Sequence, residues 1–114
     1  MSKGFPHKIA ECVGLWLAEG DNKTKSEITF TNNCLPLVIF FYKVIKRKFS
    51  NEKLKPRVYV YRTHNEVVNI PMKCKINYYQ DIRARKPYYI YRVASVNILK
   101  EWKKISQKQE VIVL

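Results

Sequence analysis

The chain has 114 residues, of which 46% are hydrophobic, and this is enough for one domain with a buried core and too little for two. Lys and Arg number 22 against 9 Asp and Glu, which gives a net charge of +13. Such a surplus predicts a polyanionic partner, most often nucleic acid. The chain has no signal-peptide pattern and no apolar run of membrane-spanning length. We therefore expect an intracellular protein of the cytoplasm or nucleoid, or of an organelle, with no membrane partner.

The three cysteines, Cys12, Cys34 and Cys74, stand singly along the chain. They form no CxxC motif, and their spacing matches no zinc-binding pattern. We interpret them as small apolar side chains in a reducing compartment. No motif indicates a small-molecule cofactor.

The first half of the chain predicts two helices on either side of a strand. Residues 8–19 are apolar at helical spacing, and residues 27–32 alternate as a strand, with Ile28 and Phe30 on one side. Asn33 is a good N-cap for a second helix, which we expect to run to about residue 49.

The second half predicts three strands and a last helix. The strand-like segments are residues 57–62, 73–79 and 88–95, and residues 80–87 look like a hairpin loop between the last two. Residues 96–106 have helical spacing. The closing EVIVL segment could be a tail strand, a partner contact or the mark of a truncation. Helices separated from an antiparallel sheet indicate an α+β fold.

Basic residues and tyrosines are interleaved through the predicted strands, where seven of the eight tyrosines lie. Alternate side chains of a strand face the same way, so the strand at 73–79 would present lysines and an asparagine on one face. Lysine neutralises phosphates, and Asn or Arg can read base edges. We interpret this surface as DNA-binding rather than as a solvated face. The expected contacts are Lys23, Lys25, Arg57, Tyr59, Arg62, Lys73, Lys75, Asn77, Arg83, Arg85, Lys86 and Arg92.

The first predicted helix has two unusual features. Ala10, Gly14 and Ala18 are four residues apart and form one stripe, along which another helix can approach closely. That other helix could be the second helix of the same chain or a second copy. The helix also closes on Glu19, although a carboxylate is disfavoured at a helix C-terminus by the macrodipole.

The segment CVGLWLAEG, residues 12–20, resembles the nine-residue signature of the LAGLIDADG homing endonucleases, in a form similar to archaeal members. Gly14 and Gly20 match the two glycines of the signature, and Glu19 matches its second acid, which binds the catalytic metal. Leu17 replaces the first aspartate. The order of predicted elements resembles that family over nearly the whole chain.

The resemblance implies a fold and an assembly. The fold would be an antiparallel sheet shaped as a saddle, with helices on one face and the signature helix at a two-fold axis. A single signature implies a homodimer that cuts both strands of a long, roughly palindromic DNA site. The residues implied at the dimer interface are Ala10, Gly14, Leu15 and Ala18.

The resemblance also implies a metal-dependent reaction. Glu19 and Gly20 would hold Mg²⁺ or Mn²⁺ between the subunits and the bound DNA. Asn32 and Lys75 are the expected secondary catalytic residues, and Asp21 would either assist the metal or solvate the turn. The other candidates are Asn33 for the amide, and Arg85 and Arg92 for the basic group.

Two other functions stay open. The segment between residues 20 and 33 is too short for the long first hairpin of many relatives, which favours a cleavage-inactive DNA-binding regulator or splicing helper of the same fold. A third interpretation is an RNA-binding module that stacks bases on its tyrosines.

Overall fold

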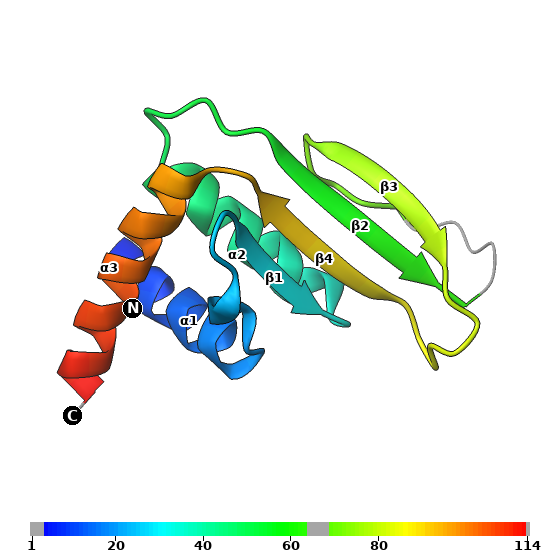
Figure 1. Cartoon of the computed structure of the whole chain (residues 1–114), viewed down its shortest axis with the longest axis horizontal. Coiled ribbons are helices and arrows are strands. Elements are labelled where there is room, and N and C mark those ends of the chain that lie inside the picture. Colours follow the sequence, from blue (N-terminus) through cyan, green and yellow to red (C-terminus); the bar gives the residue numbers. More distant parts are fainter. Residues whose placement is uncertain (1–3, 64–68, 114) are drawn as a thin grey trace.

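The computed structural model describes residues 4–63 and 69–113, with side chains as far as Lys108. The fold is α+β, as the sequence predicts, and the described residues form three helices and one sheet of four strands (Figure 1). The elements in chain order are α1 (Phe5–Ala18), the 3₁₀ turn η1 (Asp21–Lys23), β1 (Ile28–Asn32), α2 (Leu35–Lys48), β2 (Pro56–Arg62), β3 (Lys75–Gln80), β4 (Tyr88–Val93) and α3 (Val96–Val113).

The sheet is mixed, in the order β1-β4-β2-β3. Strand β4 pairs antiparallel with both β1 and β2, whereas β2 and β3 are parallel. The expectation of a wholly antiparallel sheet is therefore wrong at one pair. A parallel pair needs a long crossover connection, and residues 63–74 are long enough to provide one.

The predicted hairpin at residues 80–87 is also wrong. Because β4 lies beside β2 and not beside β3, residues 81–87 pass the end of β2 to reach the far side of that strand. Alternation along a strand shows which side chains share a face, but it does not show which strands are neighbours.

Helix α2 lies across one face of the sheet, and α1 and α3 pack at its β1 end (Figure 1). The core between these layers is rich in aromatic rings. Phe41 of α2 stacks on Phe30 with ring centroids 4.5 Å apart, and its edges meet Tyr91 at 5.8 Å and Trp102 at 5.7 Å. Trp102 of α3 in turn meets Trp16 of α1 at 6.1 Å. One chain of rings thus joins all three helices to the sheet.

Several element boundaries differ from the expectations, and β3 begins at Lys75 rather than at residue 73. Helix α1 begins at Phe5, with a proline in its first turn, where no backbone N–H is lost. The N-cap of α2 is Cys34 rather than Asn33. Residues 110–113 continue α3, so this part of the EVIVL segment is not a strand.

The cysteines behave as small side chains. Cys12, Cys34 and Cys74 are all free thiols, and burial raises the pKa of Cys12 to about 12. Across the described ranges, no helix combines the length and the apolar character needed to cross a membrane.

We expect Phe41→Ala to lower the free energy of unfolding by about 3–5 kcal/mol, the usual effect of truncating a buried aromatic side chain. The reason is that Phe41 contacts rings from β1, β4 and α3. Urea unfolding followed by circular dichroism measures this change. Truncation of Ile82, which is 81% exposed, should change the same quantity by less than about 0.5 kcal/mol, and equal losses would contradict the prediction.

Candidate functional site

The end of α1 turns the chain onto the sheet through Gly20. The N–H of Glu19 donates to the carbonyl of Leu15, and the N–H of Gly20 donates to that of Leu17, each at 3.1 Å. Gly20 has φ 74°, a left-handed conformation that favours glycine because it has no Cβ. Gly20 therefore has a structural reason to be glycine that does not depend on any metal site.

Glu19 lies exposed just after α1 and meets Asn32 at the end of β1. The Nδ2 of Asn32 donates to Oε1 of Glu19 at 3.0 Å. The other atom of the same amide, Oδ1, accepts the backbone N–H of Cys34 at 2.8 Å. Because a backbone N–H can only donate, it fixes the orientation of the amide and directs the NH₂ group at the carboxylate. Glu19 and Asn32, which the sequence predicted to share one catalytic site, are thus in contact.

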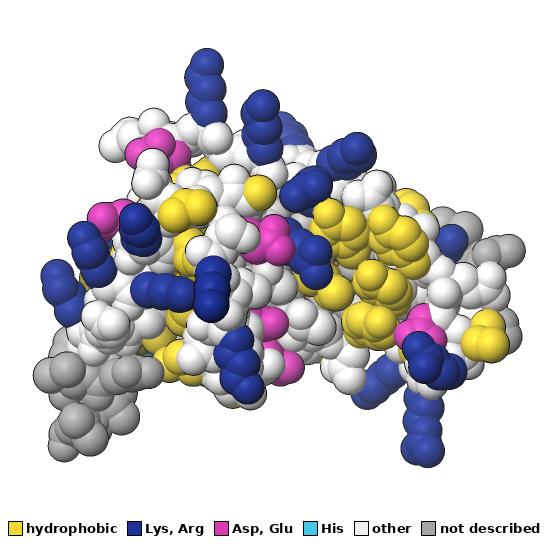
Figure 2. Space-filling view, viewed as in Figure 1, with side chains coloured by type: hydrophobic (Ala, Val, Ile, Leu, Met, Phe, Trp, Pro, Cys, Tyr) yellow, Lys and Arg dark blue, Asp and Glu magenta, His cyan; other side chains and the backbone are white. Residues whose placement is uncertain are grey.

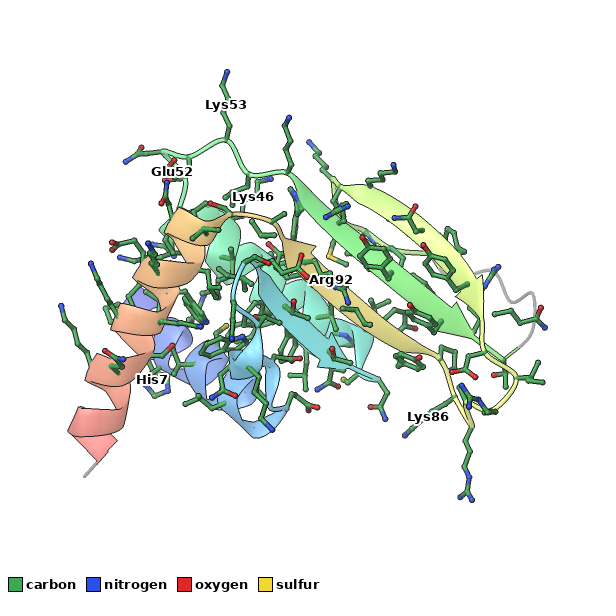
Figure 3. The ribbon with its side chains drawn as sticks, in the orientation of Figure 1. His7, Lys46, Glu52, Lys53, Lys86 and Arg92 are labelled. Atoms are coloured by element: carbon green, nitrogen blue, oxygen red, sulfur yellow. The ribbon has the colours of Figure 1, made fainter. Side chains whose placement is uncertain are left out.

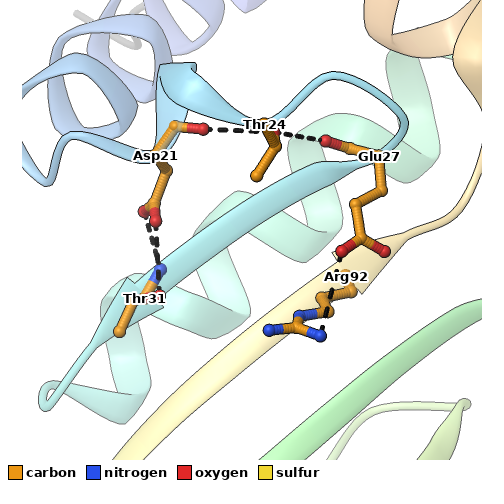
Figure 4. A network of polar contacts seen from close by, with 5 residues as sticks. All are labelled: Asp21, Thr24, Glu27, Thr31 and Arg92. Carbon is orange, nitrogen blue, oxygen red and sulfur yellow. Dashed lines mark hydrogen bonds and ion pairs between the residues drawn. The ribbon is translucent and has the colours of Figure 1, made fainter.

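Asp21 is tied to the neighbouring strand (Figure 4). Its carboxylate accepts the backbone N–H of Thr31 at 2.8 Å and the hydroxyl of Thr31 at 3.3 Å. Burial raises the pKa of Asp21 despite these two hydrogen bonds, and the negative charge of Glu19 raises it further. The carboxylates of Glu19 and Asp21 are therefore close enough to repel each other. Asp21 also holds the turn that follows α1 against β1, through its hydrogen bonds with Thr31.

The oxygen atoms at this corner suit a hard cation such as Mg²⁺, but one chain provides few of them. Within the described part of the chain, no group of three or more His, Cys, Asp or Glu side chains could hold a metal ion. Mg²⁺ is commonly held by one or two carboxylates together with waters and substrate phosphates. Glu19 can contribute one such carboxylate, since a single hydrogen bond from Asn32 uses one of its four acceptor positions.

Among the described residues, no side chain covers the small-residue stripe of α1 at Gly14. Gly14 and Ala18 are exposed, and Ala10 and Leu15 are half-buried. A Cβ built on Gly14 would meet no heavy atom outside its own helix within 4 Å. The opposite side of α1 faces the core through Ile9, Cys12, Val13 and Trp16. Packing against α2, one of the two alternatives for this stripe, therefore does not cover Gly14 and Ala18.

The sheet face away from α2 is open, and hydrophobic side chains over β2, β3 and β4 are flanked there by Lys and Arg (Figure 2). Strand register aligns its side chains in three rows. At one end lie Arg92, Arg57 and Lys75. The middle row contains Tyr59 and Asn77, and the last row contains Tyr88, Tyr61 and Tyr79. Five of the predicted DNA contacts therefore share one surface: Arg57, Tyr59, Lys75, Asn77 and Arg92.

Three cations stand side by side in the first row. Like charges that face each other across strands are destabilising. The guanidinium of Arg92 lies 5.0 Å from the ring centroid of Tyr59 and pairs with Glu27 at 3.8 Å, and that of Arg57 lies 5.9 Å from the same ring (Figures 3 and 4). An anionic ligand such as a phosphate would relieve the repulsion that Glu27 does not offset.

Other predicted contacts lie elsewhere. Arg62 points to the helix side of the sheet, over the ring of Tyr78 at 4.8 Å. Lys73 lines a hollow of about 830 Å³ beside the end of α2, with Lys46 and Lys53. The remaining predicted cations lie on exposed connections: Lys23 and Lys25 between α1 and β1, and Arg83, Arg85 and Lys86 beyond the ends of the strands.

Lys75 is not near the predicted catalytic carboxylate of its own chain. It belongs to β3, at the edge of the sheet opposite β1, which carries Asn32. Three strand spacings separate these edges, which is about 14 Å. The structure thus brings Glu19, Asn32 and Asp21 together and leaves Lys75 with the cations of the open face.

Three tyrosines that are not among the predicted DNA contacts share the open face with Tyr59. Tyr61, Tyr79 and Tyr88 lie there, whereas Tyr89 and Tyr91 are in the core. The alternation of buried and exposed positions along β2 and β4 is the signal that separates them, because Val58 and Val60 mark the core side of β2.

Comparison with known proteins returned no matching family model, no matching curated protein and no matching solved structure.

We expect Asp21→Ala to lower the free energy of unfolding by about 1–2 kcal/mol, because the backbone N–H of Thr31 loses its acceptor. Glu19→Ala should change the same quantity by less than about 0.5 kcal/mol, because Glu19 is exposed and stands at the unfavourable end of a helix. Urea unfolding of both variants checks this, and equal losses would contradict the different roles of the two carboxylates.

Proposed function

We propose that this chain is a homodimeric DNA endonuclease of the LAGLIDADG type, which cuts both strands of a long, roughly palindromic site with Mg²⁺ or Mn²⁺. The observation that carries the proposal is the corner at the end of α1. There an exposed Glu19 is held by the amide of Asn32, beside a helix face that the described part of its own chain leaves uncovered at Gly14.

A dimer would supply the additional metal ligands that the described part of one chain lacks. Pairing of two α1 helices along Gly14 and Ala18 would bring one Glu19 from each subunit to the axis. Each catalytic centre would then combine carboxylates from both subunits with phosphate oxygens of the DNA, a ligand set that suits Mg²⁺. The positive charge of the cation would also offset the repulsion between Glu19 and Asp21.

Each residue of the corner has a distinct role in this proposal. Glu19, with the carbonyl of Gly20, would hold the metal, which when bound would activate or orient water and stabilise the leaving oxygen. Asn32 would be a positioning residue, because its amide holds one oxygen of Glu19 while Cys34 holds the amide. Asp21 keeps the turn in place through Thr31. Arg92, Arg57 and Lys75 would bind the DNA backbone farther across the open face, with Lys75 at the edge strand opposite β1.

A second candidate is a DNA-binding protein of the same type that does not cut, acting as a regulator or splicing helper. Two observations favour it. The described segment between α1 and α2 contains a single strand, β1, where many relatives have a hairpin. Lys75, the expected basic catalytic residue, lies at the far edge of the sheet. The two candidates share a DNA-binding surface and differ in cleavage.

We expect Glu19→Gln to reduce Mg²⁺-dependent cleavage at least about 100-fold, because metal stabilisation of a transition state is worth several kcal/mol and each 1.4 kcal/mol is tenfold. DNA affinity measured in EDTA should stay within about twofold, since the open sheet face is unchanged. Sites selected from a random duplex library with Mg²⁺ present provide the substrate. Normal cutting by the variant would remove Glu19 from the mechanism, and binding without cutting by the parent protein would favour the second candidate.

Replacing Gly14 by Leu should convert a dimer into a monomer without loss of folding. The added side chain meets nothing in its own chain, and Leu has a higher helix propensity than Gly by up to about 1 kcal/mol. Sedimentation equilibrium measures the association, and urea unfolding measures the stability. Lys8→Leu, an exposed change on another side of α1, is the matched control. If Gly14→Leu sediments as the parent protein does, this helix face is not the interface.

A further inference from the structure

Four tyrosine rings form a continuous row across the open face. Tyr88 of β4 and Tyr61 of β2 have ring centroids 4.7 Å apart and planes within 2° of parallel. Tyr61 and Tyr79 of β3 are 5.2 Å apart, and Tyr79 and Tyr59 are 6.0 Å apart, with angles of 23° and 22° between their planes. The row spans three strands, and the cations of the face adjoin it at Tyr59.

The row is more exposed than cross-strand stabilisation alone would need. Aromatic pairs do stabilise neighbouring strands. However, Tyr79 is 45% exposed, at the edge strand of the sheet, and none of the described helices covers this side of the row. At these distances the rings are offset, so each covers its neighbour only in part. Aromatic surface therefore stays available to a ligand.

Charge identifies the kind of ligand. Arg57 and Arg92 lie against the ring of Tyr59, and Lys75 is the neighbour of Arg57 across the strand pair. The protein as a whole carries +13. A ligand that matches both parts of the surface has flat, apolar rings on a regularly anionic backbone. A nucleic-acid strand has this chemistry.

The rings favour unpaired bases over a closed duplex. In a duplex the faces of the bases are stacked on one another, and only their edges reach the grooves. A tyrosine ring can use its face only on a base that has left the stack, as in single strands, loops and opened sites. Phosphate contacts, by contrast, serve both forms equally.

We propose that the row Tyr88, Tyr61, Tyr79 and Tyr59, with Arg57, Arg92 and Lys75 at its end, is a binding site for single-stranded nucleic acid, on which unpaired bases stack. The site gives the protein a binding activity beyond duplex recognition. The proposal rests on the nucleic-acid partner of the proposed function and not on cleavage.

The test measures binding of the full chain in EDTA by fluorescence anisotropy, with labelled oligothymidylate, oligouridylate and a mixed-sequence duplex of equal length. The parent protein should bind both single strands. Tyr79→Leu should weaken single-strand binding about 10-fold, in line with the loss of one base–aromatic stack, and should change duplex binding less than twofold. Because stacking carries no charge, the salt dependence of single-strand binding should be unchanged.

Two variants are matched controls. Tyr79→Phe keeps the ring and should bind like the parent protein. Tyr78→Leu removes a tyrosine of nearly equal exposure, 43%, from the other face of the same strand, and should also bind like the parent. A matching fall in Tyr78→Leu would overturn the proposal, since it would show a general effect of altering β3.

The remaining outcomes separate this proposal from the proposed function. Duplex binding without single-strand binding, or single-strand binding that Tyr79→Leu does not weaken, overturns the stacking site and leaves the endonuclease proposal standing. If no nucleic acid binds, both fail. Stronger binding of the uridylate than of the thymidylate strand would support the site and identify RNA as its source of unpaired bases.

Discussion

The covering of the sheet on one face only is the constraint on which the rest of the molecule depends. Alternation along each strand divides the side chains between two surfaces, and the ring of Phe41 joins one of them to the helices. The other surface, the open face of the sheet, consists of the side chains at the alternate positions. In this chain those positions hold cations at one end and tyrosines at the other, so the division that builds the core also determines the chemistry of the open face.

The corner at the end of α1 joins the helical layer to that face. Gly20 takes the left-handed turn, and η1 then brings Asp21 against β1. Two carboxylates, those of Glu19 and Asp21, consequently lie near each other beside the sheet, although the helix dipole does not favour an acid at this end of α1. Asn32 holds Glu19 in place from the end of β1. The proposed metal chemistry follows from this conjunction of acid, amide and uncovered helix, and not from any one of them alone.

Most local structure was predictable because it depends on neighbours in the sequence. The spacing of apolar residues predicted three helices and four strands. The alternate positions of Val58 and Val60 predicted which face of β2 is buried. The cap of α2 was not predictable in this way. Asn33 is a good capping residue, yet it was the side chain of Asn32 that accepted the N–H of Cys34 and at the same time reached Glu19, a partner 13 positions earlier in the chain.

The sequence by itself determined the fold class, the basic character of the protein, the alternation of its strands and the acid at the end of its first helix, because each is a property of composition or of short spacing. Only the tertiary structure decided that β3 runs parallel to β2, that Lys75 lies across the sheet from Asn32, and that four tyrosines from three strands form one row. Strand order and direction depend on long connections and on packing between distant segments. The residues within a strand therefore do not determine which other strand it pairs with.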